Sequence, residues 1–339
     1  MGFDDLTRLA GSRLYARSIV DARRRFLRGE TATVAEIRKV YRQTAETIRL
    51  EIEHLTPGTL QRSHLQALAS RLERRAQELN AQVLAAARQG IYISAEAGVS
   101  ASQNVAAELL KEGWPKTEVA RLFAPVNERA VLAVLTRTQR DGLKLSDRIW
   151  RVGERMRNSV TRIVEDGVAR GLDSRKMARQ VQQYLQPGQW TQMKLETRRS
   201  LGVSKDVSYE AMRLARTEMN NAFHEGAILA NQENPAYRGV YWRLSSNHPV
   251  ADICDDMARH GGDGFYPKGE EPMRPHPQCR CLILPAYEEP VEFADRLATW
   301  IKDPQSQPDI EGWYDDARKT LQRPKATRSD ESERTRRTA

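Results

Sequence analysis

Two long stretches near the start of the chain place apolar side chains at steps of three and four residues. They cover 37–55 and 60–90, and the pair Pro57-Gly58 separates them. This spacing predicts two amphipathic helices, and a short turn between long helices favours an antiparallel hairpin. An arginine-rich amphipathic segment, 6–27, precedes the hairpin. The apolar stripes must be buried against other helices, so they constrain the chain to a mainly helical fold.

The middle of the chain, 91–203, predicts shorter helices. One of them starts at Leu145 with Ser146 as its cap, and the next starts with Asp173 or Ser174 as its cap. A helix, a tight turn and a short helix are also the parts of a DNA-reading helix-turn-helix, but the same pattern fits any helical corner. Breakers mark the joints of this region: Trp114-Pro115, Ala124-Pro125, Gly142, Gly171 and Pro187-Gly188.

The pattern changes near Asn231, where a helix gives way to strand-like segments. The stretch YRGVYWRLSS alternates apolar and polar residues, which predicts a strand, and RCLILPAY predicts a second short strand. Between them, 247–273 is rich in Gly, Asp and Pro and is expected to be a loop. The C-terminal region therefore predicts a small α+β unit with one helix, two paired strands and a long loop.

Taken together, these patterns predict a mainly α protein with a small C-terminal α+β module. A length of 339 residues favours more than one structural region. We expect these parts: an N-terminal helical hairpin (1–90), a helical middle region (91–203), the α+β module (204–290), a short helical segment (291–317) and a disordered basic tail (318–339).

The α+β module concentrates the soft metal ligands of the chain. All three cysteines lie there, and an odd, small number of cysteines argues against a disulfide framework. Zinc prefers thiolate and imidazole ligands in a tetrahedral shell, and structural sites take ligands from two segments. Zinc is therefore the expected cofactor, with five candidate ligands for four positions: His248, Cys254, His276, Cys279 and Cys281.

Two other interpretations of this cluster remain open. Free cysteines are often simply buried, and a histidine before a proline is a common turn residue. A zinc ion with an open position would instead activate water, with Asp252, Asp255 or Glu218 as the base, as in a zinc hydrolase or nuclease. No H-E-x-x-H motif supports that enzymatic alternative.

Structural pairing is the interpretation we favour for the polar residues Arg216, Glu218, Asp252 and Asp255. Arg216 and Glu218 do not face the same way on a helix, so they do not form a local ion pair. We expect one of the two to turn toward the strands and to have a partner there, either Arg243 for Glu218 or Asp252 for Arg216.

The net charge of +9 makes contact with phosphate or an acidic protein surface plausible. The tail 318–339 has eight basic and three acidic residues and lacks apolar periodicity, so it is a candidate for binding double-stranded DNA. No apolar run is long enough for a membrane segment, and no signal-peptide core is visible, so we expect cytoplasmic synthesis. The basic candidates are Arg318, Lys319, Arg323, Lys325, Arg328, Arg334, Arg336 and Arg337.

An ordered series of motifs resembles a known family. "ARTE", the aromatic strand "YWRLSSNHP", "DICD", the loop with "FYPKGE" and finally "PHPQCRC" occur in this order. The series resembles the C-terminal domain of phage head morphogenesis proteins, the Mu F-like minor capsid proteins, over about 145–287. Many members carry C-x-x-C in the first ligand segment, where this chain has His248 and the single Cys254. If the cluster binds zinc, the resemblance implies that His248 takes the place of the missing cysteine.

The resemblance implies a non-enzymatic minor head protein of a tailed bacteriophage or prophage. Such a protein is associated with the portal at the inside of the capsid, and acts in head morphogenesis and in DNA packaging or ejection. It is made in the host cytoplasm and resides in the virion, and no small-molecule substrate is expected. The implied partners are the portal protein, the capsid interior and genomic double-stranded DNA; a non-catalytic DNA-binding protein is the other alternative.

Overall fold

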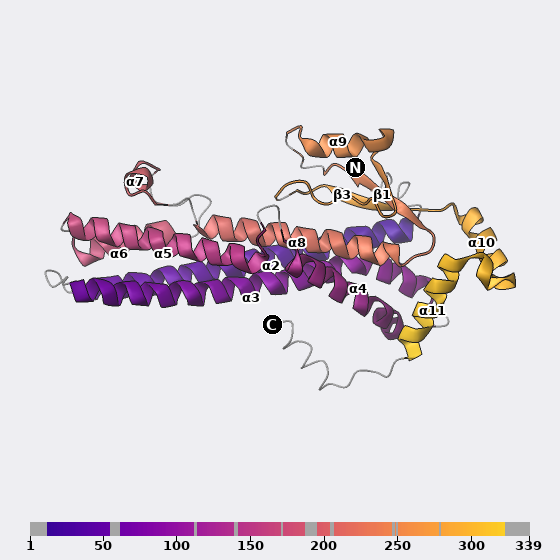
Figure 1. Cartoon of the computed structure of the whole chain (residues 1–339), viewed down its shortest axis with the longest axis horizontal. Helices are drawn as coiled ribbons and strands as arrows, with labels where there is room; N and C mark the ends of the chain where they lie inside the picture. Colours follow the sequence, from indigo (N-terminus) through magenta and orange to yellow (C-terminus); the bar gives the residue numbers. More distant parts are fainter. Residues whose placement is uncertain are drawn as a thin grey trace. The chain divides into compact units, whose positions relative to one another are not determined.

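A computed structural model describes residues 12–54, 62–111, 114–138, 142–170, 172–186, 195–203, 207–245, 248, 250–277 and 279–322. Over these residues the protein is mainly helical, with a small three-stranded antiparallel sheet near the C-terminus, as predicted (Figure 1). None of the described helices combines the length and apolarity needed to cross a membrane. The helices are α2 (Arg13–Glu53), α3 (Arg62–Leu109), α4 (Lys116–Thr136), α5 (Leu145–Ala169), α6 (Ser174–Leu185), α7 (Leu195–Ser200), α8 (Val207–Gln232), α9 (Ile253–Arg259), α10 (Pro290–Lys302) and α11 (Pro308–Gln322).

The chain divides into two compact units, each built from segments that are far apart in sequence. Unit 1 comprises Met1–Arg28, Ile91–Val134 and Met219–Ala339, and unit 2 comprises Gly29–Gly90 and Leu135–Glu218. The sequence had suggested successive regions, because periodicity shows where a helix lies but not which distant segment covers its apolar stripe.

Unit 2 is a bundle of helices around an aliphatic core. The predicted hairpin is present: Arg75, near the start of α3, contacts Glu51, near the end of α2, at 2.7 Å, so the two helices are antiparallel. Asp173 caps α6 by accepting a hydrogen bond from the backbone N of Lys176 at 2.9 Å. The fully buried core includes Ile37, Ile48, Ile52, Leu79, Met156, Ile163, Val181 and Leu185.

In unit 1 the backbones of α3 and α8 come into direct contact at two glycines. A Cβ atom on Gly98 would lie 2.2 Å from the carbonyl O of Phe223, and one on Gly226 would lie 2.5 Å from the carbonyl O of Ala95. Only glycine allows this approach, because any side chain would overlap a carbonyl group. Phe26 of α2 packs on Phe223, with ring centroids 4.9 Å apart.

The sheet of unit 1 has the strand order β2-β1-β3, with antiparallel pairing throughout. The strands are β1 (Tyr237–Arg243), β2 (Phe265–Pro267) and β3 (Leu282–Tyr287). The predicted strands correspond to β1 and β3, which pair with Trp242 opposite Ile283. The sequence missed β2 and α9, which lie in the stretch predicted to be a loop. Both are short, three and seven residues, and too short for a periodic pattern to appear.

Several predicted helix boundaries are wrong. The segments 6–27 and 37–55 belong to one helix over the described residues, because Gly29 alone is tolerated inside a helix. The second helix of the hairpin continues through Gly90 to Leu109, and Pro125 lies inside α4. In each of these three helices, a packed apolar stripe compensates for the one unfavourable residue.

Two further differences concern caps and the tail. Lys144 is the N-cap of α5, and Ser146 lies inside the helix. The first five residues of the tail, 318–322, belong to α11, so the prediction of disorder is wrong for them. The breakers Pro57-Gly58, Gly171 and Pro187-Gly188 and the rest of the tail, 323–339, lie outside the described residues.

The glycine contact between α3 and α8 predicts a specific loss of stability. Gly98→Ala should lower the free energy of unfolding by about 1–3 kcal/mol, because its Cβ would overlap a backbone carbonyl. Gly312→Ala is the matched control, since a Cβ at this helical glycine meets no atom within 4 Å, and it should be neutral or stabilising by about 0.5–1 kcal/mol. Denaturant unfolding followed by circular dichroism measures both; equal effects would contradict the close contact.

Candidate metal centre

The first segment of the cluster is held by the cap of α9. Asp252 accepts a hydrogen bond from the backbone N of Cys254 at 2.7 Å, and Asp255 accepts one from the backbone N of Asp252 at 2.8 Å. Asp252 also accepts a bond from the backbone N of Asp255, and this bond and the one from the backbone N of Asp252 to Asp255 form a reciprocal capping box that starts the helix. Cys254, in the first turn, is the only buried residue of α9. The cap therefore fixes the direction in which this thiol enters the module.

The second segment leads from the loop after β2 into β3. It supplies His276, which is half-buried, and Cys279 and Cys281, which are each about 1% exposed. Trp242 of β1 is fully buried and packs with all three cysteines in one core cluster. The central strand of the sheet thus forms the apolar wall behind the thiols.

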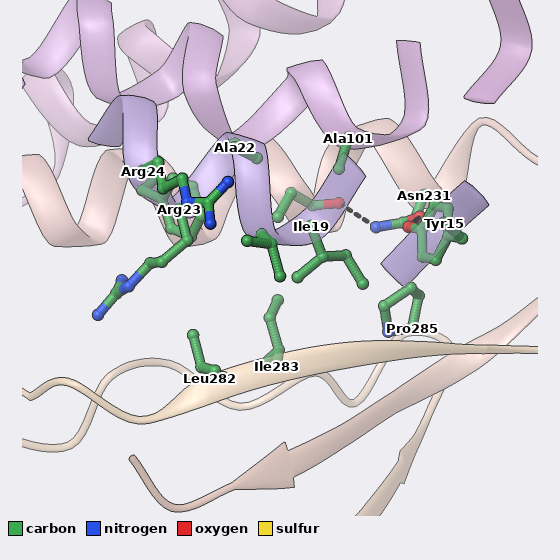
Figure 2. A pocket seen from close by; sticks show the side chains of 14 residues that line it. Tyr15, Ile19, Ala22, Arg23, Arg24, Ala101, Asn231, Leu282, Ile283 and Pro285 are labelled. Carbon is green, nitrogen blue, oxygen red and sulfur yellow. Dashed lines mark hydrogen bonds between the residues drawn. The ribbon is translucent and has the colours of Figure 1, made fainter. Parts of the chain in front are cut away.

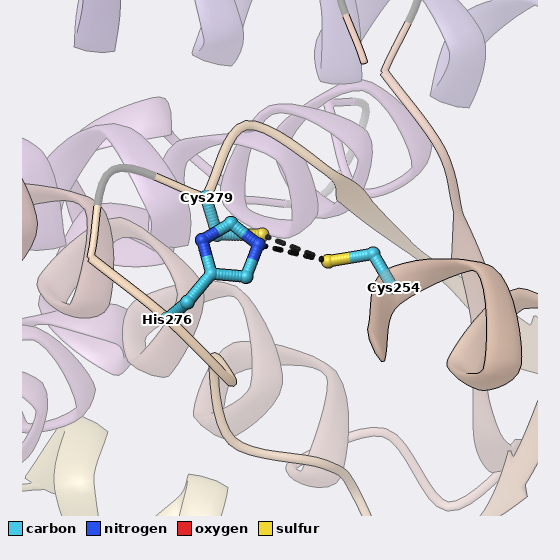
Figure 3. A group of neighbouring side chains, drawn as sticks. All are labelled: Cys254, His276 and Cys279. Atoms are coloured by element: carbon cyan, nitrogen blue, oxygen red, sulfur yellow. Dashed lines mark hydrogen bonds between the residues drawn. The ribbon is translucent and has the colours of Figure 1, made fainter. Parts of the chain in front are cut away.

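The two segments bring two thiols and one imidazole into contact (Figure 3). The Sγ of Cys254 lies 3.2 Å from Nε2 of His276 and 3.6 Å from the Sγ of Cys279. All three ligand atoms lie within 4.8 Å of one another, and the group could hold a metal ion. Three of the five predicted ligands are therefore together.

Cys281 lies beside this group and interacts with both other cysteines. The pKa of the Cys279 thiol is lowered because Cys281 donates a hydrogen bond to it, with Arg274 as a further cause. Burial raises the pKa of Cys254, and the bond to Cys279 raises that of Cys281. One thiolate, on Cys279, is thus stabilised between two protonated thiols, and Cys281 is the nearest candidate for a fourth ligand.

Two side chains hold the Cys279–Cys281 segment in place. Arg274, which is half-buried, donates hydrogen bonds to the carbonyl O of Cys281 at 2.8 Å and to that of Cys279 at 3.2 Å. Its Nη1 also lies 3.6 Å from the Sγ of Cys279. Asn220, in the middle of α8, donates to the same carbonyl of Cys279. The segment is therefore tied to α8.

His248 does not join the thiols. Its Nε2 lies 3.0 Å from Asp255 and 3.8 Å from Asp252, and these three residues form a separate group. The two groups touch where Nε2 of His276 lies 3.3 Å from Asp252. This geometry argues against His248 as the substitute for the missing cysteine, because the imidazole of His248 contacts Asp255 in the cap of α9 instead.

The polar residues have other partners than those expected. Arg216 pairs with the buried Glu30 at 3.6 Å. Arg243 donates to the carbonyl O of Asp263 and lies over the ring of Tyr241. Asp252 caps α9 and contacts the histidines, and Glu218 is buried. The sequence predicted structural pairing of these charges but not which segment of the fold meets them.

Of the candidate DNA-binding residues, Arg318 and Lys319 are exposed on α11. The other six, Arg323 to Arg337, lie outside the described residues. The sequence also missed Arg274 and Asn220, although the first stands two residues before His276. The spacing of Asp252 and Asp255, three residues apart, is the signal in the sequence that could have indicated the cap.

Comparison of the chain with protein-family models, with curated proteins and with solved structures gives no match.

The packing of Trp242 against the three cysteines predicts that a cavity at this position destabilises the module. Trp242→Ala should cost about 3–5 kcal/mol, because a fully buried aromatic side chain is removed. The exposed Trp150 on α5 provides a matched control, and Trp150→Ala should change stability by less than about 0.5 kcal/mol. Denaturant unfolding monitored by hydrogen exchange in β1 and β3 would test this; unchanged protection in the Trp242 variant would refute it.

Proposed function

We propose that this protein is a non-enzymatic minor head protein of a tailed bacteriophage or prophage, whose C-terminal module is closed by a zinc ion. The observation that carries the proposal is the convergence of Cys254, His276 and Cys279, with Cys281 beside them, from two segments of the module. The zinc ion would supply a structural cross-link between α9 and the start of β3.

The donor set and its spacing fit zinc. Ligands at the usual zinc distances stand about 3.8 Å apart for two thiolates and about 3.5 Å apart for a thiolate and an imidazole nitrogen in a tetrahedron. The corresponding distances here are 3.6 Å between Cys254 and Cys279 and 3.2 Å between Cys254 and His276. Only a small expansion of the group is needed to reach those values.

The charge around the site also fits a bound zinc ion. Three thiolates and one neutral imidazole around Zn²⁺ carry a net charge of −1, which is costly to bury without a partner. Arg274, which is half-buried, supplies a positive charge 3.6 Å from the Sγ of Cys279. The same guanidinium would therefore neutralise the loaded site while holding the two carbonyl groups beside it.

A site with four protein ligands leaves no open position, which is typical of structural zinc. The enzymatic alternative requires Cys281 to stay outside the shell, and one observation favours it: Cys281 is not part of the group of three. In that case Asp252, 3.3 Å from His276, would be the candidate base of a hydrolase or nuclease. The role of Cys281 therefore distinguishes the two functions.

The role in the phage head is supported by the ordered motifs of 145–287 and by the basic charge of the chain. We propose the portal protein and the capsid interior as its partners, with the virion as its location after synthesis in the host cytoplasm. The basic residues after Gln322 are the proposed contacts with packaged double-stranded DNA.

Elemental analysis of the purified protein tests the zinc centre. The wild type should contain one zinc ion per chain, and Cys254→Ser, Cys279→Ser and His276→Ala should each lose it because a ligand is removed. His248→Ala is the matched control and should keep its zinc. Cys281→Ser should lose zinc in the structural site and keep it in the enzymatic one.

Three results would contradict the proposed centre. They are a wild type purified with zinc supplementation that contains none, retention of zinc in Cys279→Ser, and loss of zinc in His248→Ala. Chelation adds a second readout, because a structural zinc is coupled to folding and its removal should abolish hydrogen-exchange protection of α9.

Co-expression with the portal protein of the same genome tests the role in the head. A minor head protein should co-purify with portal rings and should be found in assembled heads by mass spectrometry. Binding to double-stranded DNA without any binding to the portal would instead support the plain DNA-binding alternative, and deletion of 323–339 should then lower the salt-dependent affinity.

A further inference from the structure

Helix α10 carries apolar residues on two neighbouring faces. One face packs toward α11: the ring of Trp300 lies 5.3 Å from that of Tyr314, and its Nε1 donates to Glu311 at 2.7 Å. The other face is exposed and is formed by Val291, Ala294, Ala298 and Ile301, which recur at steps of three and four residues. We name these four residues the α10 stripe.

The α10 stripe lacks a covering element over the described part of the chain. Val291 is 73% exposed and Ile301 is 72% exposed, and α10 has no buried residue. A helix that is apolar on two faces is normally covered on both. The surrounding segment, 288–316, has nine acidic and two basic residues, a net charge of −7 in a chain of +9. A partner for the stripe should therefore be apolar with a positive rim.

Unit 1 contains a groove of this chemistry. It lies between the first turns of α2 and β3 and has a volume of about 420 Å³. Figure 2 shows Ile19 of α2 facing Leu282 and Ile283 of β3 across it, with Arg23 and Arg24 at one end. Arg24 contacts Asp21 but keeps 66% of its side chain exposed. We name this site the α2–β3 groove.

We infer that the α10 stripe of one copy docks into the α2–β3 groove of a second copy of this chain. The lengths match: Val291 and Ile301 are ten residues apart, about 15 Å along the helix, and the groove follows α2 over 15–24, about 14 Å. The charges match as well, because Glu292 and Asp295 flank the stripe and the two arginines stand at the groove.

Other candidate partners for the α10 stripe fit less well. The segment 323–339 has the right charge but contains no Leu, Ile, Val, Met or aromatic residue to cover an apolar stripe. Two α10 stripes facing each other would bring like charges together. Because stripe and groove are different surfaces, their contact is head-to-tail and builds a ring or an open chain of copies.

Sedimentation velocity of the full chain over a range of concentrations tests this inference. The wild type should self-associate, and added salt should weaken the association. Val291→Asp combined with Ile301→Asp should raise the dissociation constant about tenfold or more, because two buried aliphatic contacts are lost. Arg24→Glu should weaken it from the groove side. Leu109→Asp, at a residue of α3 that is 74% exposed, is the matched control and should have no effect.

A photo-crosslinking amino acid at position 301 identifies the docking surface directly. In a mixture of isotopically heavy and light chains, crosslinks between copies to 19–24 or 282–285 would support the inference. A wild type that stays monomeric, crosslinks to any other surface, or groove variants that associate like wild type would overturn it. All variants replace exposed residues, and unchanged circular dichroism and melting confirm that each remains folded.

Discussion

Contact between three thiols and one imidazole holds the part of the module that has the least apolar surface of its own. Helix α9 buries a single residue, Cys254, and all residues of β2 are only half-buried. Without the cluster, the chain from 253 to 281 would be attached by the short pairing of β2 with β1 and by separate hydrogen bonds, such as those that Glu271 accepts from Gln232 and Tyr237. Zinc binding to such sites contributes on the order of 10–16 kcal/mol to folding in small peptides, far more than burial of one cysteine. The proposed zinc would therefore contribute more to the stability of this part of the module than its apolar contacts do.

The sheet is connected to the helices of unit 1 by a small set of long-range contacts. Tyr15 of α2 donates a hydrogen bond to Asn231 of α8 at 2.7 Å, and Tyr287 of β3 lies 3.0 Å from the hydroxyl of Tyr15. Burial raises the pKa of Tyr15, which keeps its hydroxyl protonated as a donor. Together with the glycine contact of α3 and α8, these bonds join three parts of the sequence into one unit. The same arrangement leaves the groove between α2 and β3 open.

Helical periodicity predicted most of the fold but not its connections. The stripes of α2, α3 and α5 are long enough to identify these helices from sequence alone. Continuity through Gly29, Gly90 and Pro125 was not predictable, because it depends on how much packed surface compensates for an unfavourable residue. The units could not be predicted either, since a stripe does not reveal which distant helix covers it.

For the candidate site as well, the sequence predicted which residues are ligands but not how the fold arranges them. Residue types and spacing were sufficient to name five ligands, and the structure brings three of them together with Cys281 beside them. The sequence could not exclude His248 from the ligand set. The structure does so because Asp255, in the cap of α9, contacts the imidazole of His248 at 3.0 Å. Arg274 and Asn220 act through backbone carbonyls, and no sequence motif marks such contacts. Candidate ligands can be recognised from short sequence segments, whereas the side chains that hold those ligands in position come from distant segments.

X-ray absorption at the zinc edge of the purified protein is the most direct measurement of the central claim. The account predicts a four-coordinate shell with three sulfur atoms at about 2.3 Å and one nitrogen atom at about 2.0–2.1 Å. A shell of two sulfur atoms with water or carboxylate oxygen would place Cys281 outside and favour the enzymatic site. A shell dominated by nitrogen and oxygen, or no bound zinc, would contradict the proposed closure of the module.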